Sequence, residues 1–135
     1  MNLEQIKQKI GADSICRDGV FVKNNKKGIV NLKTGEIIRE PFVDDIFSDG
    51  IFRQGDKWGL LNLKTGEIIR EPFVDVIYSN GMFRQDGKWG LINLETGETI
   101  KEAFADVIYS DGGFILNDKW GVINLETGEI IKEAE

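Results

Sequence analysis

Histidine is absent from these 135 residues, and the chain has a single cysteine and only two prolines. Without histidine the protein lacks the commonest general base near neutral pH and the commonest transition-metal ligand. One cysteine, Cys16, cannot form an intrachain disulfide, so the pattern is not that of a disulfide-stabilised secreted miniprotein. We therefore expect neither histidine-dependent catalysis nor a disulfide framework.

The chain also lacks a basic excess and long hydrophobic runs. Lys and Arg number 17 against 23 Asp and Glu, which leaves a formal net charge of −6 and little attraction for phosphates. No apolar run approaches the roughly 20 residues that a membrane-spanning helix needs. The start of the chain lacks the continuous apolar region of a signal peptide. We expect no nucleic-acid partner, no membrane association and a cytoplasmic location.

The dominant feature is an internal repeat with a period of 31 residues. Residues 10–40, 41–71, 72–102 and 103–133 align without insertions or deletions, and 13 positions carry the same residue in all four repeats. The two middle repeats are identical at 21 of 31 positions. Such a period is typical of a repeat array, in which neighbouring repeats bury each other's apolar faces.

Each repeat contains a predicted β-hairpin with a two-residue turn. In the second repeat two extended runs flank Gly55-Asp56, residues that tolerate the positive φ of tight turns. This register places Phe52 opposite Gly59, and an aromatic ring over a cross-strand glycine compensates for the missing side chain. The same pair recurs in the other repeats as Phe21 with Gly28, Phe83 with Gly90, and Phe114 with Gly121.

A second turn, a strand and a connection complete each repeat. The run Asn-Leu-Lys-Thr-Gly-Glu that ends after Gly66 is typical of a type I turn closed by a left-handed glycine. Pro41 and Pro72 follow the strand and fit only an edge strand or a connection. Residues 42–47 are apolar at i, i+1, i+4 and i+5, which predicts one helical turn packed on the sheet. Each repeat is thus predicted to be a three-stranded antiparallel meander plus one packed connection.

Residues 1–9 differ from the repeats and predict a capping helix. Asn2 and Gln5 fit a capping box, and apolar residues recur on one helical face. The predicted fold is therefore all-β. It consists of four tandem 31-residue antiparallel β-meander repeats over residues 10–135. We expect an open solenoid-like or blade-like array, with the short N-terminal helix covering the altered first repeat.

The repeats resemble the bacterial WG repeats. The resemblance rests on a Lys-Trp-Gly triplet, the following Asn-Leu-x-Thr-Gly-Glu run and an upstream Asp-Gly step. The triplets are Lys57-Trp58-Gly59, Lys88-Trp89-Gly90 and Lys119-Trp120-Gly121, and the Asp-Gly steps are Asp49-Gly50 and Asp111-Gly112. The first repeat departs from the pattern, with Lys27 in place of tryptophan. The resemblance covers residues 10–133 and implies an all-β binding or scaffold module, without catalytic residues to carry over.

The carboxylates favour structural over chemical roles. The stretch around Asp44 and Asp45 lacks the alternating ligands and closing glutamate of a calcium loop. We expect Asp44, Asp75 and Asp106 to cap a local turn instead. Glu36 recurs identically in every repeat, whereas a catalytic pair of carboxylates needs two different environments. We expect a non-enzymatic protein without a cofactor or a bound metal.

Cys16 and the tryptophans stand at two positions that can be compared between the repeats. Cys16 occupies the position of an aromatic residue in the other repeats, so we expect a small buried hydrophobe. The candidate binding residues are the tryptophans and the arginines opposite them: Arg53, Trp58, Arg84, Trp89 and Trp120. We expect the tryptophans to pack between successive repeats, with Arg53 stacked on Trp58 and Arg84 on Trp89. The alternative is an exposed tryptophan stripe that binds a ligand.

The leading functional hypothesis is a module that binds another protein through a surface built from equivalent positions. The regular array, the acidic charge and the missing catalytic residues favour it. One alternative is a carbohydrate or cell-surface ligand module that uses the tryptophan ladder. Another is a small acidic inhibitor or immunity-type protein that occludes a basic partner.

The fourth repeat departs from the others at one strand. It places Ile115-Leu116 where the middle repeats have Arg-Gln. Two added aliphatic side chains would contribute roughly 3–6 kcal/mol if they were fully buried. Burial inside the monomer would require the array to curl until the fourth repeat meets the first. The sharper hypothesis is a homodimer through the C-terminal repeat, in which Ile115 and Leu116 meet their counterparts in a second copy.

Overall fold

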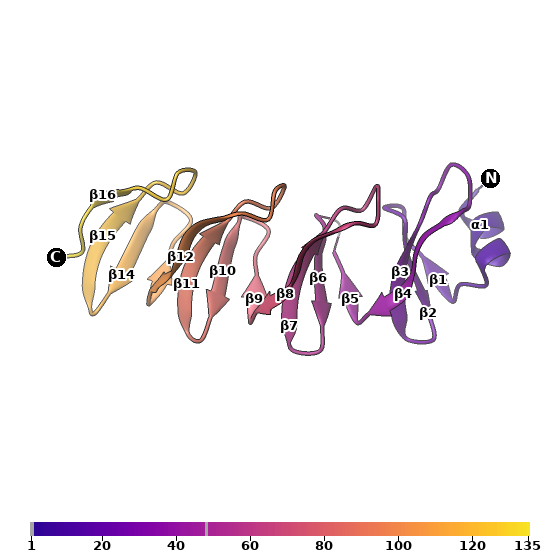
Figure 1. The fold of residues 1–135 in the computed structure, drawn as a ribbon, viewed down its shortest axis with the longest axis horizontal. Coiled ribbons are helices and arrows are strands. Elements are labelled where there is room, and N and C mark those ends of the chain that lie inside the picture. Colours follow the sequence, from indigo (N-terminus) through magenta and orange to yellow (C-terminus); the bar gives the residue numbers. More distant parts are fainter. Residues whose placement is uncertain (1, 48) are drawn as a thin grey trace. The chain divides into compact units, whose positions relative to one another are not determined.

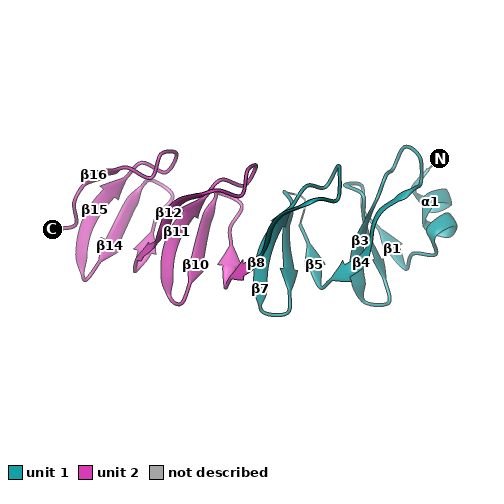
Figure 2. Cartoon of the chain, viewed as in Figure 1, with its two compact units in different colours: residues 1–72 teal, residues 73–135 magenta. Residues whose placement is uncertain are grey.

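The structure, a computed structural model, describes residues 2–47 and 49–135. Its elements are one short helix and four antiparallel sheets of four strands each (Figure 1). The chain divides into two compact units, residues 1–72 and residues 73–135, which we describe separately (Figure 2). The predicted all-β architecture of four repeated meanders with an N-terminal helix is confirmed.

Unit 1 begins with helix α1 (Leu3–Ile10) and contains the first sheet and most of the second. The first sheet comprises β1 (Ser14–Ile15), β2 (Val20–Lys23), β3 (Lys26–Val30) and β4 (Ile37–Val43). The second sheet comprises β5 (Asp45–Ile46), β6 (Ile51–Gln54), β7 (Lys57–Leu61) and β8 (Ile68–Val74). In both sheets the spatial order of the strands follows the sequence.

Unit 2 begins inside β8 and contains the third and fourth sheets. The third sheet comprises β9 (Val76–Ile77), β10 (Met82–Gln85), β11 (Lys88–Ile92) and β12 (Thr99–Ala105). The fourth sheet comprises β13 (Val107–Ile108), β14 (Gly113–Leu116), β15 (Lys119–Ile123) and β16 (Ile130–Lys132).

The connection between repeats is extended and not helical, so this part of the prediction was wrong. Strand β4 continues through Pro41 to Val43, and Asp45–Ile46 then forms the first strand of the next sheet. Val43 and Ile46 are buried in one cluster, so two extended segments bury the apolar residues that suggested a helical turn. Each meander therefore has four strands. Pro41 lies in the edge strand β4, as expected, where its missing N–H leaves no ladder bond broken.

Helix α1 begins and ends at the predicted signals. The side chain of Asn2 accepts from the Gln5 N–H at 2.8 Å, and the side chain of Gln5 accepts from the Asn2 N–H at 2.9 Å. Gly11 ends the helix with a φ of 70°. Ile6 and Ile10 are buried against the first sheet. The helix therefore caps that sheet, as predicted.

Both predicted turns are present in every repeat. The hairpin registers pair each phenylalanine with its glycine: Phe21 with Gly28, Phe52 with Gly59, Phe83 with Gly90, and Phe114 with Gly121. In the second turn the Asn62 side chain accepts from the Lys64 N–H at 2.8 Å and the Thr65 N–H at 3.2 Å. Gly66 closes this turn with a φ of 76°. Asparagine and glycine are thus required by backbone geometry.

Each sheet has two faces because side chains alternate along a strand. We call the face with the hairpin phenylalanine the Phe face, and the opposite face, with the tryptophan position, the Trp face. Within each unit the Trp face of one sheet packs on the Phe face of the next. In unit 1 this core contains Val20, Ile29, Val43, Ile46, Phe52 and Leu61. In unit 2 it contains Met82, Leu91, Ala105, Ile108, Phe114 and Ile123.

Candidate functional site

Each tryptophan stacks on an aromatic ring of its own sheet. The ring centroids of Phe47 and Trp58 are 5.3 Å apart with an interplanar angle of 3°, and those of Tyr78 and Trp89 are 5.2 Å apart at 5°. Tyr109 and Trp120 stack at 5.6 Å and 14°. One face of each indole is therefore covered from within its own repeat. Trp89 also packs on the core between the third and fourth sheets, as expected for packing between successive repeats.

The first repeat lacks both members of this stack. Cys16 stands at the phenylalanine or tyrosine position and Lys27 at the tryptophan position. Cys16 is exposed, so the prediction of a buried thiol was wrong. At the same repeat position Phe47 and Tyr109 are themselves 42% and 43% exposed, whereas Tyr78 is half-buried and packs on the core of unit 2.

Arg53 binds a carboxylate and not the tryptophan ring. Its Nε and Nη2 donate to Asp45 Oδ2 at 2.9 and 2.6 Å, and Lys27 Nζ lies 3.1 Å from Asp45 Oδ1. Partial burial acts to raise the pKa of Asp45, but the hydrogen bonds from Arg53 and Lys27 outweigh it and hold the pKa below its ordinary value. In the third sheet Arg84 is exposed and lies opposite Val76, where the second sheet has Asp45. The predicted role of Arg53 is therefore corrected to an ion pair within unit 1.

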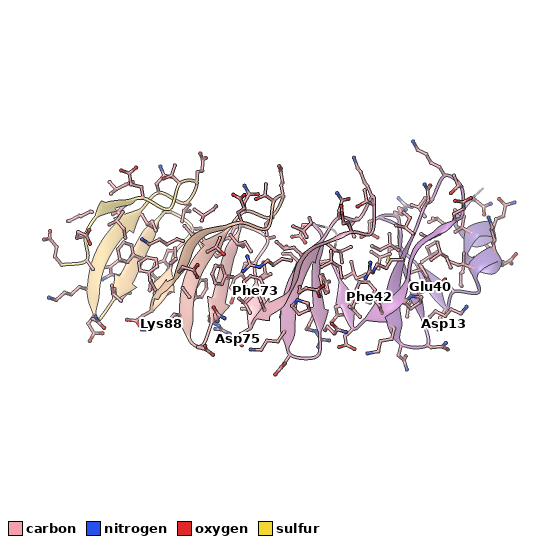
Figure 3. All side chains as sticks on the ribbon, in the orientation of Figure 1. Asp13, Glu40, Phe42, Phe73, Asp75 and Lys88 are labelled. Carbon is pink, nitrogen blue, oxygen red and sulfur yellow. The ribbon has the colours of Figure 1, made fainter. Side chains whose placement is uncertain are left out.

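The aspartates at the position of Asp44 cap the hairpin turns further along the chain and not the local turn that we expected. The Oδ2 atoms of Asp44, Asp75 and Asp106 accept from backbone N–H groups eleven residues later at 2.7, 2.8 and 2.9 Å. Asp75 is labelled in Figure 3, together with Lys88 of the following hairpin. Lys88 donates a hydrogen bond to Asp106 and forms an ion pair with it. This bond, together with the bond from the Asn117 N–H, holds the pKa of Asp106 below its ordinary value. Among residues 2–47 and 49–135, no three His, Cys, Asp or Glu side chains form a group that could hold a metal ion.

Two equivalent grooves lie beside the Asn-Leu-x-Thr-Gly turns, one in each unit. The groove of unit 1 has a volume of about 440 Å³ and that of unit 2 about 410 Å³. Ile38 and Leu63 line the first and pack on the core of unit 1, whereas Ile100 and Leu125 line the second and pack on the core of unit 2. Both grooves therefore have an apolar floor that the sheets hold in place.

The rims of the two grooves carry opposite charge. Lys33 and Lys64 line the groove of unit 1 together with one carboxylate, Asp18, so its charged lining is basic on balance. Glu95 and Glu126 occupy the positions of the two lysines in unit 2. All four side chains project from turns whose backbone is held by an asparagine, so the charges stand at fixed places. These residues were missed by the sequence analysis. The signal in the sequence was one position of the Asn-Leu-x-Thr-Gly turn, which is lysine in the first two repeats and glutamate in the last two.

The structure places the two candidate residues of the fourth repeat on opposite faces. Leu116 is half-buried and packs on the core of unit 2. Ile115 lies on the Trp face, opposite Trp120 on β15 and Val107 on β13. Leu116 is thus partly covered within unit 2 without any curling of the chain. Only Ile115 remains a candidate for contact with another molecule.

The single helix among the described residues is α1, which is too short to cross a bilayer. In comparisons with known proteins, no family model matches the chain. No curated protein matches it either, so the resemblance to WG repeats rests on the triplets, the turns and the period.

Proposed function

We propose that this chain is a non-enzymatic module of the WG-repeat type that binds a protein partner through its two grooves. The observation that carries the proposal is that equivalent grooves occur in both units, with lysines on the rim of one and glutamates on the rim of the other. An apolar floor with a charged, solvent-exposed rim is the usual anatomy of a protein-binding surface. The sign of the rim selects the partner and speeds its association.

The partner we propose carries an acidic segment for the groove of unit 1 and a basic segment for that of unit 2. Lys33 and Lys64 attract the former, and Glu95 and Glu126 attract the latter. Two weak contacts on one partner reinforce each other, because the second forms at high effective concentration. This arrangement spreads affinity over equivalent positions of the repeat.

The environment of the tryptophans supports protein binding over carbohydrate binding. Trp58 and Trp89 are half-buried, and an aromatic ring of the same sheet covers one face of each indole. Sugar recognition by a tryptophan ladder needs open aromatic faces on successive rings, whereas of the three tryptophans only Trp120 is exposed, at 55%. The turn-flanking glutamates likewise occupy one repeated environment, which supports the non-enzymatic proposal.

The test is affinity capture from the native cell with tagged wild type and two charge-reversed variants. Lys33→Glu with Lys64→Glu changes the first rim, and Glu95→Lys with Glu126→Lys changes the second. We expect one protein to be retained by wild type and lost, by about tenfold or more in recovery, with each variant.

A matched control reverses a charge away from both grooves, as in Lys7→Glu on helix α1. This variant should retain the partner. Capture that the groove variants leave unchanged would contradict the proposal, and a glycan bound in place of a protein would favour the tryptophan stripe.

A further inference from the structure

The Trp face of the fourth sheet is uncovered in the described structure. Val122 is 36% exposed there, whereas its equivalents on the covered Trp faces, Ile29 and Leu91, are buried. Ile131 is 66% exposed, whereas its equivalent Ile38 packs on the core of unit 1. The residues that form the core between sheets in each unit therefore lie open to solvent on this face.

This uncovered face is also more apolar than its counterpart in the second sheet. The cross-strand pair Asp45–Arg53 of the second sheet is replaced by Val107–Ile115 in the fourth. An ion pair has thus been exchanged for two aliphatic side chains next to Trp120, which is 55% exposed. A contiguous exposed apolar patch of this kind marks an interaction site.

The face carries an exposed indole, that of Trp120, beside a hollow. Gly113 stands where the second and third sheets have Ile51 and Met82, and the missing side chain leaves a hollow of about 220 Å³ next to the Trp120 indole. Gly113 has a backbone conformation that any residue adopts, so it is not needed for a turn. An exposed indole and a hollow on one face allow the indole of one copy to enter the hollow of a second, rotated copy.

The rim of the hollow carries one charge of each sign. Asp111 and Lys132 both line it. When two such faces meet about a two-fold axis, Asp111 of each copy can meet Lys132 of the other. The charge pattern is therefore self-complementary, as an isologous interface requires.

We propose that this chain forms a two-fold homodimer in which the Trp faces of the two fourth sheets pack together, with Trp120 of each copy in the hollow beside Gly113 of the other. In each unit a Trp face packs on the Phe face of the next sheet, so a Trp face is a surface that another sheet can cover, here the Trp face of a second copy. A second copy is favoured over another partner because the exposed indole, the hollow and both charges lie on one surface. The proposal goes beyond the proposed function, since it uses a different surface and a different partner.

Sedimentation equilibrium of the 135-residue chain between about 1 and 100 μM tests the proposal. We expect a dimer for wild type. Gly113→Met, which fills the hollow with the residue of the third sheet, and Ile131→Arg should each weaken dimerisation by about tenfold or more. Gln8→Arg on helix α1 adds the same charge at an exposed site and should leave the dimer unchanged.

A charge exchange tests the two-fold contact itself. Asp111→Lys and Lys132→Asp should each give a monomer, because like charges then meet across the axis. An equimolar mixture of these two variants should form a heterodimer, since both contacts again join opposite charges. Circular dichroism confirms that each variant is folded, which matters because Asp111 also accepts from the Gly113 N–H at 2.9 Å.

Three outcomes would overturn the proposal. The first is a wild type that stays monomeric at about 100 μM. The second is a dimer that the face variants leave intact. The third is a mixture of folded Asp111→Lys and Lys132→Asp that remains monomeric.

Discussion

The ring of Phe83 lies against Gly90 on the neighbouring strand, so that a Cβ at residue 90 would stand 2.6 Å from the ring. The same Cβ would stand 2.7 Å from the carbonyl oxygen of Lys101. A side chain at residue 90 therefore has no room, because the Phe83 ring lies on one side and the backbone of Lys101 on the other. Phe52 and Phe114 approach Gly59 and Gly121 in the same way, whereas at Gly28 the close neighbours are backbone atoms of residues 39–41.

We expect Gly90→Ala to reduce the free energy of unfolding by about 2–3 kcal/mol, because the ring and the backbone must both move to admit one methyl group. Urea denaturation measures the loss. The control is Gly87→Ala in the hairpin turn, where φ is +81° but nothing lies within 4 Å of the added Cβ. Its loss should be about 1 kcal/mol, from backbone strain alone. Equal losses would contradict the close-packing explanation.

Gly66 combines a left-handed backbone with a close approach, and we expect Gly66→Val to cost about 2–4 kcal/mol. A Cβ there would stand 2.7 Å from Cγ2 of Ile38 in the preceding sheet. Gly66→Asn separates the two effects, since asparagine tolerates the positive φ but still meets Ile38. The melting temperature should fall in the order wild type, Asn, Val. A valine variant that melts with wild type would refute the turn assignment.

The Asp45–Arg53 pair and the Val107–Ile115 pair occupy the same cross-strand positions, so a double-mutant cycle can exchange one for the other. Arg53→Ile alone should cost about 1 kcal/mol, because Asp45 loses its bidentate partner. Arg53→Ile with Asp45→Val should cost less than the sum of the single changes, by about 0.5–1 kcal/mol. Strict additivity in chemical denaturation would show that the two positions are independent.

Acid should weaken the contacts between hairpins. The pKa values of Asp44 and Asp106 lie below the ordinary value of 3.8, chiefly because Lys26 and Lys88 donate hydrogen bonds to them. A lowered pKa in the folded state means stabilisation that is complete above the ordinary pKa and is lost as the pH falls through the folded value. The melting temperature should therefore drop below about pH 4. Asp106→Asn should show a smaller drop than wild type, and an identical pH profile would contradict this assignment.

Most of the local structure could be predicted because single residues determine it. The hairpin register follows from dipeptides that tolerate positive φ and from the Phe52–Gly59 pair, which the structure confirms. The helix cap follows from Asn2 and Gln5, each of whose side chains accepts a hydrogen bond from the backbone N–H of the other. In each case the interacting groups are close in sequence, so tertiary packing has little to add.

The candidate surfaces were harder to predict because their residues are assembled from different strands. The opposite orientation of Ile115 and Leu116 does follow from strand alternation, a signal that was present in the sequence. Neither the ion pair of Arg53 nor the exposure of Cys16 has such a signal. Arg53 meets Asp45 only because β5 pairs with β6, and Cys16 is exposed at a position where Phe47 and Tyr109 are exposed as well.

By itself the sequence determined the period, the turns, the helix cap and the alternation of apolar positions, since these depend on φ preferences and on hydrogen bonds within a few residues. The tertiary structure decided that residues 42–47 are extended, because Val43 pairs with β3 and Ile46 with β6 while both enter the core of unit 1. It also decided which faces are covered. Val122 and Ile29 are both aliphatic and occupy the same position of the repeat. Ile29 is buried because a neighbouring sheet packs on it, and Val122 is exposed because no sheet covers it in the described structure.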